Sequence, residues 1–171
     1  SADKPSDGSH PFSAFTASVL QLRPESTGHL ELRSADPDDH PAIHPSYLAA
    51  ARDCDTIVAG IKVARTVCAT EPVKSLITDE HSPGPSVGAD DDEAILNWAR
   101  NTATTIYHPT GTCKMGNDKR AVVNDRWQVH GVEGLRVADA SIMPTITSGN
   151  TNAPAIMIGE KASEMVLKEA V

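Results

Sequence analysis

The sequence predicts an α+β fold, in which strands and helices occupy different stretches of the chain. Two observations lead to this prediction. Apolar and polar residues alternate in the first third of the sequence, which indicates strands, and apolar residues recur at helical spacing in three later stretches. Of the 171 residues, 39% are hydrophobic, which is enough to build the core of one domain.

The strand signals stand near the N-terminus. Residues 1–11 are polar and rich in turn formers, which is typical of a leader or linker. The alternation from Phe15 to Leu22 changes phase near Val19 and predicts a strand with a bulge. A turn at 24–28 and a second apolar alternation at 29–33 complete a predicted hairpin.

Residues 37–45 are predicted to form a loop rich in aspartate and histidine. His40 and His44 stand four residues apart, a spacing that suits a metal site on a helix. Pro41 and Pro45 make a helix unfavourable there, so we interpret both histidines as solvated loop residues and predict no metal site.

Three helices follow. Asp53 is a plausible cap for a helix that ends near Ala69, with a core stripe formed by Ile57, Ile61, Ala64 and Cys68. The acidic run 90–93 begins a second helix, where negative charge favours the helix dipole, and we prefer this cap to a cation site. A third helix is predicted from about Asn152 to Lys168, after short strands at 127–130 and 135–137.

Composition excludes several classes of partner. The formal net charge of −8 argues against binding of nucleic acid or of an anionic membrane. No apolar run approaches the roughly 20 residues of a membrane span. Cys54, Cys68 and Cys113 are odd in number and widely spaced, which favours a reducing compartment, and we expect a cytoplasmic protein.

Two segments carry the chemistry. The first is Tyr107–Gly116, which places His108 between turn-forming residues, and the second is Ser148–Pro154, which places Asn150 before the last helix. A neutral imidazole with a hydrogen-bonding partner is suited to taking a proton from a hydroxyl group near neutral pH. Asn150 could instead serve only as a helix cap. Cys113 lacks the other groups that a thiol nucleophile requires.

These segments, in this order, together with Val129–Pro144 and the run from Ile156 to Lys161, resemble the C-terminal part of the glucose-methanol-choline (GMC) family of flavin-dependent alcohol oxidoreductases. The likeness covers roughly residues 105–168 and is strongest to the choline and alcohol dehydrogenase branch.

The resemblance implies a domain organisation. Residues 12–116 would be a substrate-domain portion that carries the histidine loop on a mostly antiparallel sheet with packed helices, and residues 117–171 would return to complete the flavin-binding domain. None of the 11 glycines forms the GxGxxG pattern that cradles a dinucleotide, so we expect the N-terminal FAD-binding half to be absent. That half is then the expected partner. Without it the chain should hold no FAD, be inactive and tend to self-associate.

The resemblance also implies site roles. His108 would be the base, and Asn150 would assist hydride transfer from a small alcohol to flavin N5; counting back from Gly159 selects Asn150 over Asn152. The cofactor-binding residues would be Asp139 and Ala140 beside the ribityl and pyrophosphate portion, and Thr151 and Asn152 beside the flavin. Asp139 could instead begin a turn. The alternative to an enzyme is a non-enzymatic remnant that keeps the fold. The identity of the alcohol is left open, and the likeness favours a dehydrogenase over an oxidase.

Overall fold

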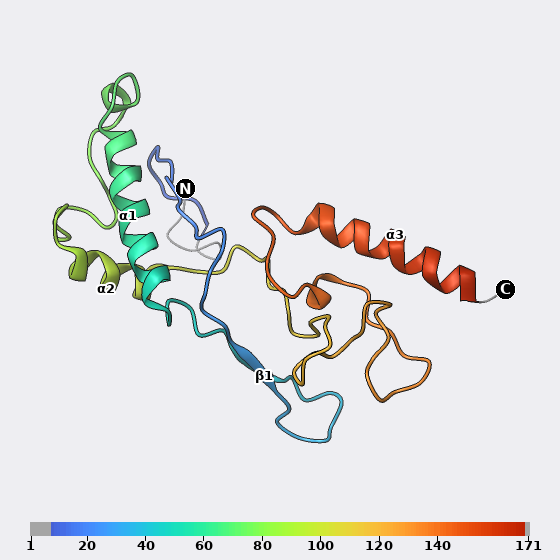
Figure 1. Ribbon diagram of the computed structural model, residues 1–171. Helices are drawn as coiled ribbons and strands as arrows, with labels where there is room; N and C mark the ends of the chain where they lie inside the picture. Colours follow the sequence, from blue (N-terminus) through green and yellow to red (C-terminus); the bar gives the residue numbers. More distant parts are fainter. Residues whose placement is uncertain (1–7, 170–171) are drawn as a thin grey trace. The chain divides into compact units, whose positions relative to one another are not determined.

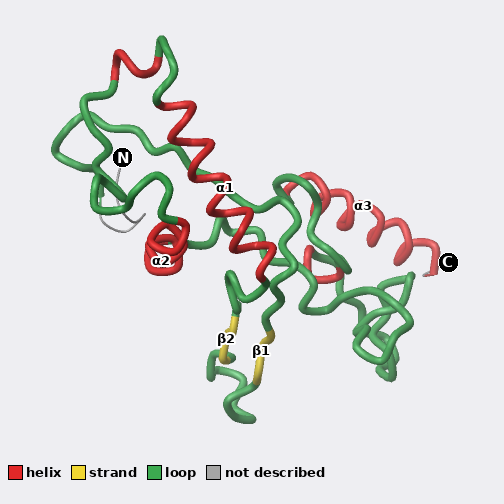
Figure 2. Tube along the Cα trace, turned by 60° about the vertical axis from the view of Figure 1, so that its left-hand side comes forward, coloured by secondary structure: helices red, strands yellow, loops and turns green. Residues whose placement is uncertain are grey.

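The computed structural model describes residues 8–169 and contains three α-helices and one small sheet (Figures 1 and 2). The helices are α1 (Ala51–Cys68), α2 (Asp92–Thr102) and α3 (Asn152–Glu169), with short 3-10 helices η1 (Val73–Leu76) and η2 (Ala140–Ile142). Strands β1 (His29–Glu31) and β2 (Ala42–His44) form a two-stranded antiparallel sheet. This content accords with the predicted α+β class.

The chain divides into two compact units. The first unit combines the described residues up to Gln21 with Leu48–Ala103, and the second combines Leu22–Tyr47 with Thr104 and the residues that follow it. The segment 104–116 therefore packs in the same unit as residues 117–169. The expected division between residues 116 and 117 refers to the domains of a complete enzyme and stays a prediction.

The first unit is built on the packing of α1 against α2. Its buried core consists of Val58, Ile61, Ile95 and Ala99, and Ile95 is fully buried. The acidic run before α2 acts as a cap, as predicted, because Asp91 Oδ1 accepts a hydrogen bond from the Ala94 amide at 2.9 Å.

Asp53 was expected to cap α1, and that expectation is wrong. The helix begins one turn earlier with Ala50 at the N-cap position, so Asp53 lies inside the first turn. Its side chain is buried, 2% exposed, and Oδ1 accepts from Gln21 Nε2 at 3.5 Å. The buried cysteine of this helix is Cys54, whereas Cys68 is only half-buried.

The predicted hairpin has a different partner strand. β1 pairs with β2 in the register His29↔His44, so residues 42–44, which were expected to be a loop, supply the returning strand. Gly28 permits this pairing, because a Cβ there would meet the His44 carbonyl oxygen at 2.0 Å. The segment 15–22 forms no strand, and Val19 packs against Gly60 of α1 instead.

The second unit has its own core around Trp127. The buried residues are Val123, Trp127, Ile142, Met143 and Ile158, the last of which anchors α3. Isolated bridges (Val123↔Val129 and Gln128↔Arg136) take the place of the strands predicted at 127–130 and 135–137. Turns interrupt these segments, so only single residue pairs form bridges and no continuous strand pairing develops.

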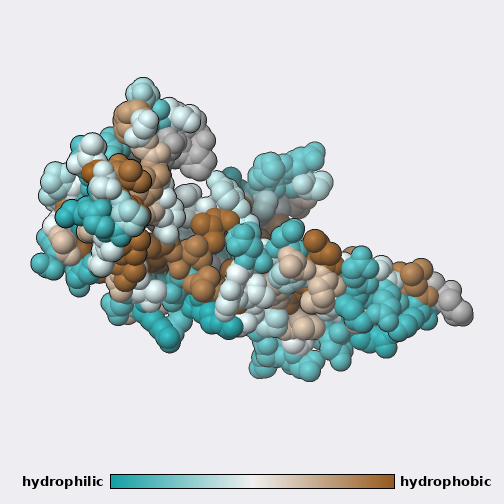
Figure 3. All heavy atoms as spheres, turned by 90° about the horizontal axis from the view of Figure 1, so that it is seen from above, coloured by the Kyte–Doolittle hydropathy of each residue, from teal (hydrophilic) through white to brown (hydrophobic). Residues whose placement is uncertain are grey.

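Large apolar side chains are exposed on helices of both units. They include Val63 and Val67 on α1 and Ile156, Met157, Val166 and Leu167 on α3. Figure 3 shows brown hydrophobic atoms at the surface along α3. Among residues 8–169, no helix combines the length and the apolar character that a membrane crossing requires.

Candidate functional site

The two segments singled out by the sequence meet in the second unit. His108 Nδ1 lies 2.9 Å from Thr151 Oγ1, across 43 residues of sequence. His108 is half-buried, and Thr151, directly before α3, is buried with 8% exposed. The imidazole is therefore fixed at the N-terminus of a helix by a hydroxyl group that has little freedom to move.

The histidine loop is tied to the segment around η2 by backbone hydrogen bonds. The Cys113 amide donates to the Ser141 carbonyl at 3.0 Å, and the Met115 amide donates to the Ile142 carbonyl at 2.8 Å. Gly111 has a φ of +86°, and a Cβ there would meet the Met143 carbonyl oxygen at 3.4 Å. Glycine therefore suits both the left-handed backbone and the close approach of the two segments.

Tyr107, which precedes His108, has a φ of +65°. A bulky residue in this left-handed region costs on the order of 1–3 kcal/mol, and such strain persists only where the surroundings enforce it. The Tyr107 amide donates to Thr105 Oγ1 at 3.0 Å, which holds this backbone turn. The direction in which His108 leaves the chain is thereby set locally.

The contact with Thr151 defines which nitrogen of His108 is free for chemistry. Nδ1 is engaged in this contact, so Nε2 is the nitrogen that is left for other groups. In the tautomer that carries its proton on Nδ1, Nδ1–H donates to Oγ1 and Nε2 is an unprotonated acceptor. An imidazole held in this tautomer can take a proton from a hydroxyl group placed at Nε2.

Asn150 and Asn152 lie on either side of Thr151 and both are exposed. In the described part of the chain, His108 makes no hydrogen bond with Asn150, so the contact between the two segments runs through Thr151. The first hydrogen bond at the start of α3 runs from the Ala155 amide to the Thr151 carbonyl at 2.9 Å. The first amides of α3 have no partner within the helix and present a partial positive charge.

Asp139 and Ala140 stand at the start of η2. Asp139 Oδ1 accepts from the Ser141 amide at 2.7 Å, so the side chain initiates this turn. Asp139 is exposed and Ala140 is half-buried against the Trp127 core. His130 Nε2 contacts the Gly116 carbonyl at 3.0 Å and links the turn that follows it to the end of the histidine loop.

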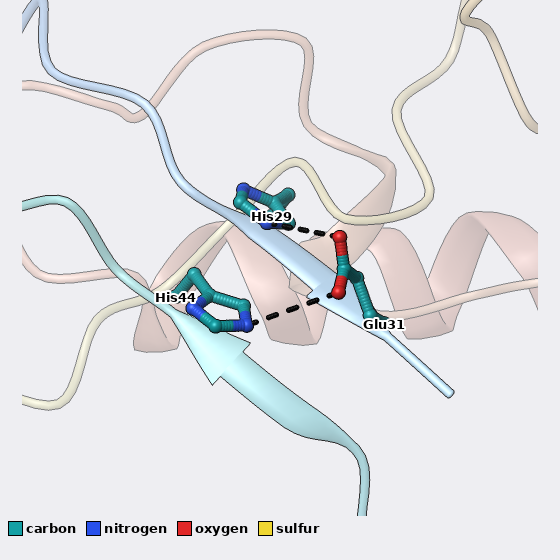
Figure 4. A group of neighbouring side chains, drawn as sticks. All are labelled: His29, Glu31 and His44. Carbon is teal, nitrogen blue, oxygen red and sulfur yellow. Dashed lines mark ion pairs between the residues drawn. The ribbon is translucent and has the colours of Figure 1, made fainter. Parts of the chain in front are cut away.

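A separate group of side chains lies on the hairpin. The sequence analysis set aside a pairing of His40 with His44 and interpreted both as solvated loop residues, whereas the structure brings His44 next to His29 and Glu31 (Figure 4). Their ligand atoms lie within 4.8 Å of one another, and all three residues are exposed. Sequence reasoning missed this group because its members belong to two strands whose pairing was predicted wrongly.

Comparison with known proteins gives consistent results. The sequence matches the family profile described as GMC oxidoreductase over residues 24–159. It is 44% identical over 155 residues to an alcohol dehydrogenase [acceptor] of Pseudomonas putida, covering 91% of this chain and 28% of that protein. It is 43% identical over 152 residues to an oxygen-dependent choline dehydrogenase of Cronobacter sakazakii, covering 89% of this chain and 27% of that protein.

Solved structures show the same likeness. Pyridoxine 4-oxidase from Mesorbium loti superimposes with a TM-score of 0.76 at 29% identity, over 84% of this chain and 28% of the oxidase. An FAD-dependent oxidoreductase from Chaetomium thermophilum gives a TM-score of 0.80 at 29% identity, over 87% of this chain and 26% of that enzyme. The chain thus spans about a quarter of the length of the proteins that it matches. The extent of the family match, over most of the chain, establishes that this protein belongs to the GMC oxidoreductase family.

Proposed function

We propose that the chain is the C-terminal part of an FAD-dependent alcohol oxidoreductase of the choline and alcohol dehydrogenase type. The observation that carries the proposal is the contact of His108 Nδ1 with Thr151 Oγ1 at the start of α3, in a chain whose relatives include an alcohol dehydrogenase and choline dehydrogenases. Activity requires an FAD-binding portion, supplied by the same or another chain, since no dinucleotide-binding glycine pattern occurs in these 171 residues.

His108 is the proposed base. In the tautomer whose Nδ1–H donates to Thr151, Nε2 accepts the hydroxyl proton of a small alcohol, and the alkoxide that forms can release the hydride of its carbinol C–H bond to become a carbonyl. FAD, when bound, supplies the acceptor for that hydride at flavin N5. A positioned base of this kind typically contributes about 10² to 10⁴ in rate.

Asn150 is the proposed second group. Its amide is exposed next to Thr151, the residue that contacts His108, and we propose that it offers an N–H donor to a substrate oxygen bound near His108. A donor aimed at the developing alkoxide stabilises the transition state more than the neutral alcohol, so its effect is on turnover.

The residues around the α3 N-terminus fit a flavin. The free amides of the first helical turn, beginning at Asn152, together with the Thr151 backbone favour the electron-rich carbonyl edge of the ring system. Because Asp139 Oδ1 is engaged with the Ser141 amide, we propose that Asp139 and Ala140 reach the ribityl and pyrophosphate portion with their remaining polar groups.

The test uses the full-length protein loaded with FAD. Anaerobic stopped-flow mixing with choline and a panel of primary alcohols should reduce the flavin, observed as loss of its visible absorbance. His108→Ala should lower the rate of reduction about 10²-fold or more with FAD content unchanged. His40→Ala, on the exposed hairpin, is the matched control and should leave the rate unchanged. An unchanged rate in His108→Ala removes the base from the proposal, and a flavin that no alcohol reduces favours a non-enzymatic remnant.

A further inference from the structure

The β1–β2 hairpin holds three potential metal ligands on one face. His29 and His44 are directly opposite one another in the antiparallel register. Glu31 stands two residues after His29 on the same strand, and residues separated by two project from the same side of a strand. Figure 4 shows the two imidazole rings and the carboxylate turned toward one another, with the carboxylate facing both rings.

The ligand atoms are already close together. His29 Nε2 lies 3.3 Å from Glu31 Oε1, and His44 Nε2 lies 4.0 Å from Glu31 Oε2. The two rings are stacked with their centroids 4.6 Å apart and an angle of 18° between the planes. A tetrahedral Zn²⁺ with ligand bonds of about 2.1 Å needs ligand atoms about 3.4 Å apart. The spacing of the ligand atoms is close to this value, and binding requires the two stacked rings to turn so that both nitrogen lone pairs converge on the ion.

Exposure and charge also suit a cation. The side chains of His29, Glu31 and His44 are 55%, 63% and 50% exposed, so an ion has free access and the side chains have room to rotate. The formal net charge of −8 attracts cations to the chain as a whole. The backbone beneath the group is closely packed. Gly28 lies so near the His44 carbonyl that a Cβ atom at this position would collide with it.

From this arrangement we propose that His29, Glu31 and His44 bind a divalent transition-metal ion, with Zn²⁺ as the best match. Two imidazole nitrogens and one carboxylate oxygen are the ligand types that such ions prefer, and three protein ligands leave the fourth position to water. The site is separate from the His108 segments in sequence, and it is independent of the proposed redox function. Binding would tie β1 to β2 and stabilise the hairpin.

The test is isothermal titration calorimetry, in which ZnCl₂ is added to the full-length protein prepared without a histidine tag. Titration with CoCl₂ gives a second readout, because tetrahedral Co²⁺ develops characteristic visible absorption. We expect one ion bound per chain at this site. His29→Ala, His44→Ala and Glu31→Gln should each weaken the affinity of that ion about 10-fold or more, in line with the losses seen when a metal's supporting residues are removed. These positions are exposed, so the variants should fold normally, which circular dichroism verifies.

His40→Ala is the matched control, since His40 is an exposed histidine between the two strands and outside the group. Its affinity for Zn²⁺ should equal that of the parent protein. The proposal is overturned if the parent binds no ion, if the three variants bind as tightly as the parent, or if His40→Ala weakens binding as much as His44→Ala does. The last result would place the ion on His40 and His44, the pairing that the sequence analysis set aside.

Discussion

Replacement of Thr151 by valine tests the contact on which the candidate site depends. Valine has nearly the shape of threonine but cannot form the hydrogen bond that joins Thr151 Oγ1 and His108 Nδ1 at 2.9 Å. Because Thr151 is buried, water has little access to replace the lost partner. We expect the imidazole to keep its place in the loop but to lose its fixed orientation and tautomer.

The size of the effect follows from the energy of one hydrogen bond. A neutral hydrogen bond contributes about 0.5–1.5 kcal/mol, and 1.36 kcal/mol corresponds to a factor of ten in rate. Thr151→Val should therefore lower kcat and kcat/KM together by about 2- to 13-fold, far less than the loss expected for His108→Ala. Because His108 Nδ1 loses its partner beside a buried position, the substitution should also cost about 1–3 kcal/mol of stability.

The assay is anaerobic flavin reduction by the best alcohol substrate, together with a thermal midpoint for each variant. Thr151→Ser keeps the hydroxyl group and loses only the methyl group. It should therefore keep most of the parent rate. A merely structural role would instead give equal losses in Thr151→Ser and Thr151→Val, or a loss of thermal midpoint with kcat intact. Either result would refute the assignment of Thr151 as the residue that positions His108.

The remaining predictions concern neighbouring residues and the two cores. Asn150→Ala should reduce kcat and kcat/KM together, whereas Asn152→Ala should cost about 1 kcal/mol of stability at most with little change in turnover; the opposite pattern in kinetics and thermal melts would move the role to Asn152. Ile95→Ala, at a fully buried position, should lower the free energy of unfolding in urea by about 2–5 kcal/mol, and a loss below about 1 kcal/mol would show that this core does not stabilise α1 and α2. Hydrogen bonds from Lys161 and then Lys168 lower the pKa of Glu164 from its usual 4.5 to about 2. Since the folded pKa is the lower one, the stabilisation of α3 is present above about pH 4.5 and fades as pH falls toward 2, so parent and Glu164→Gln should converge in stability at low pH; a difference that grows on acidification would contradict this.

Local patterns in the sequence determined the helices. The apolar stripe of α1, the acidic cap of α2 and the proline in the first turn of α3 are all short-range signals, and α2 and α3 begin within two residues of their predicted starts. The cap of α1 is the exception. Asp53 has the chemistry of a cap, but burial against Gln21 placed it one turn inside the helix. Side-chain type alone does not distinguish a cap from a buried carboxylate with a partner.

The strands and the candidate site show where sequence reasoning stopped. Alternation at 15–22 and at 29–33 is equally compatible with pairing between them, but long-range packing gave β1 the partner β2 and laid Val19 on α1. The motifs around His108 and Asn150 were found from sequence, whereas the contact between them proved to run through Thr151.

The chain by itself thus determined its helical segments and the residue types of its chemistry, because both depend on neighbours a few positions apart. Only the tertiary structure decided which side chains meet: Thr151 with His108, and His29 with Glu31 and His44. Such meetings depend on strand register and on packing between distant segments, where a shift of one residue turns a side chain to the opposite face.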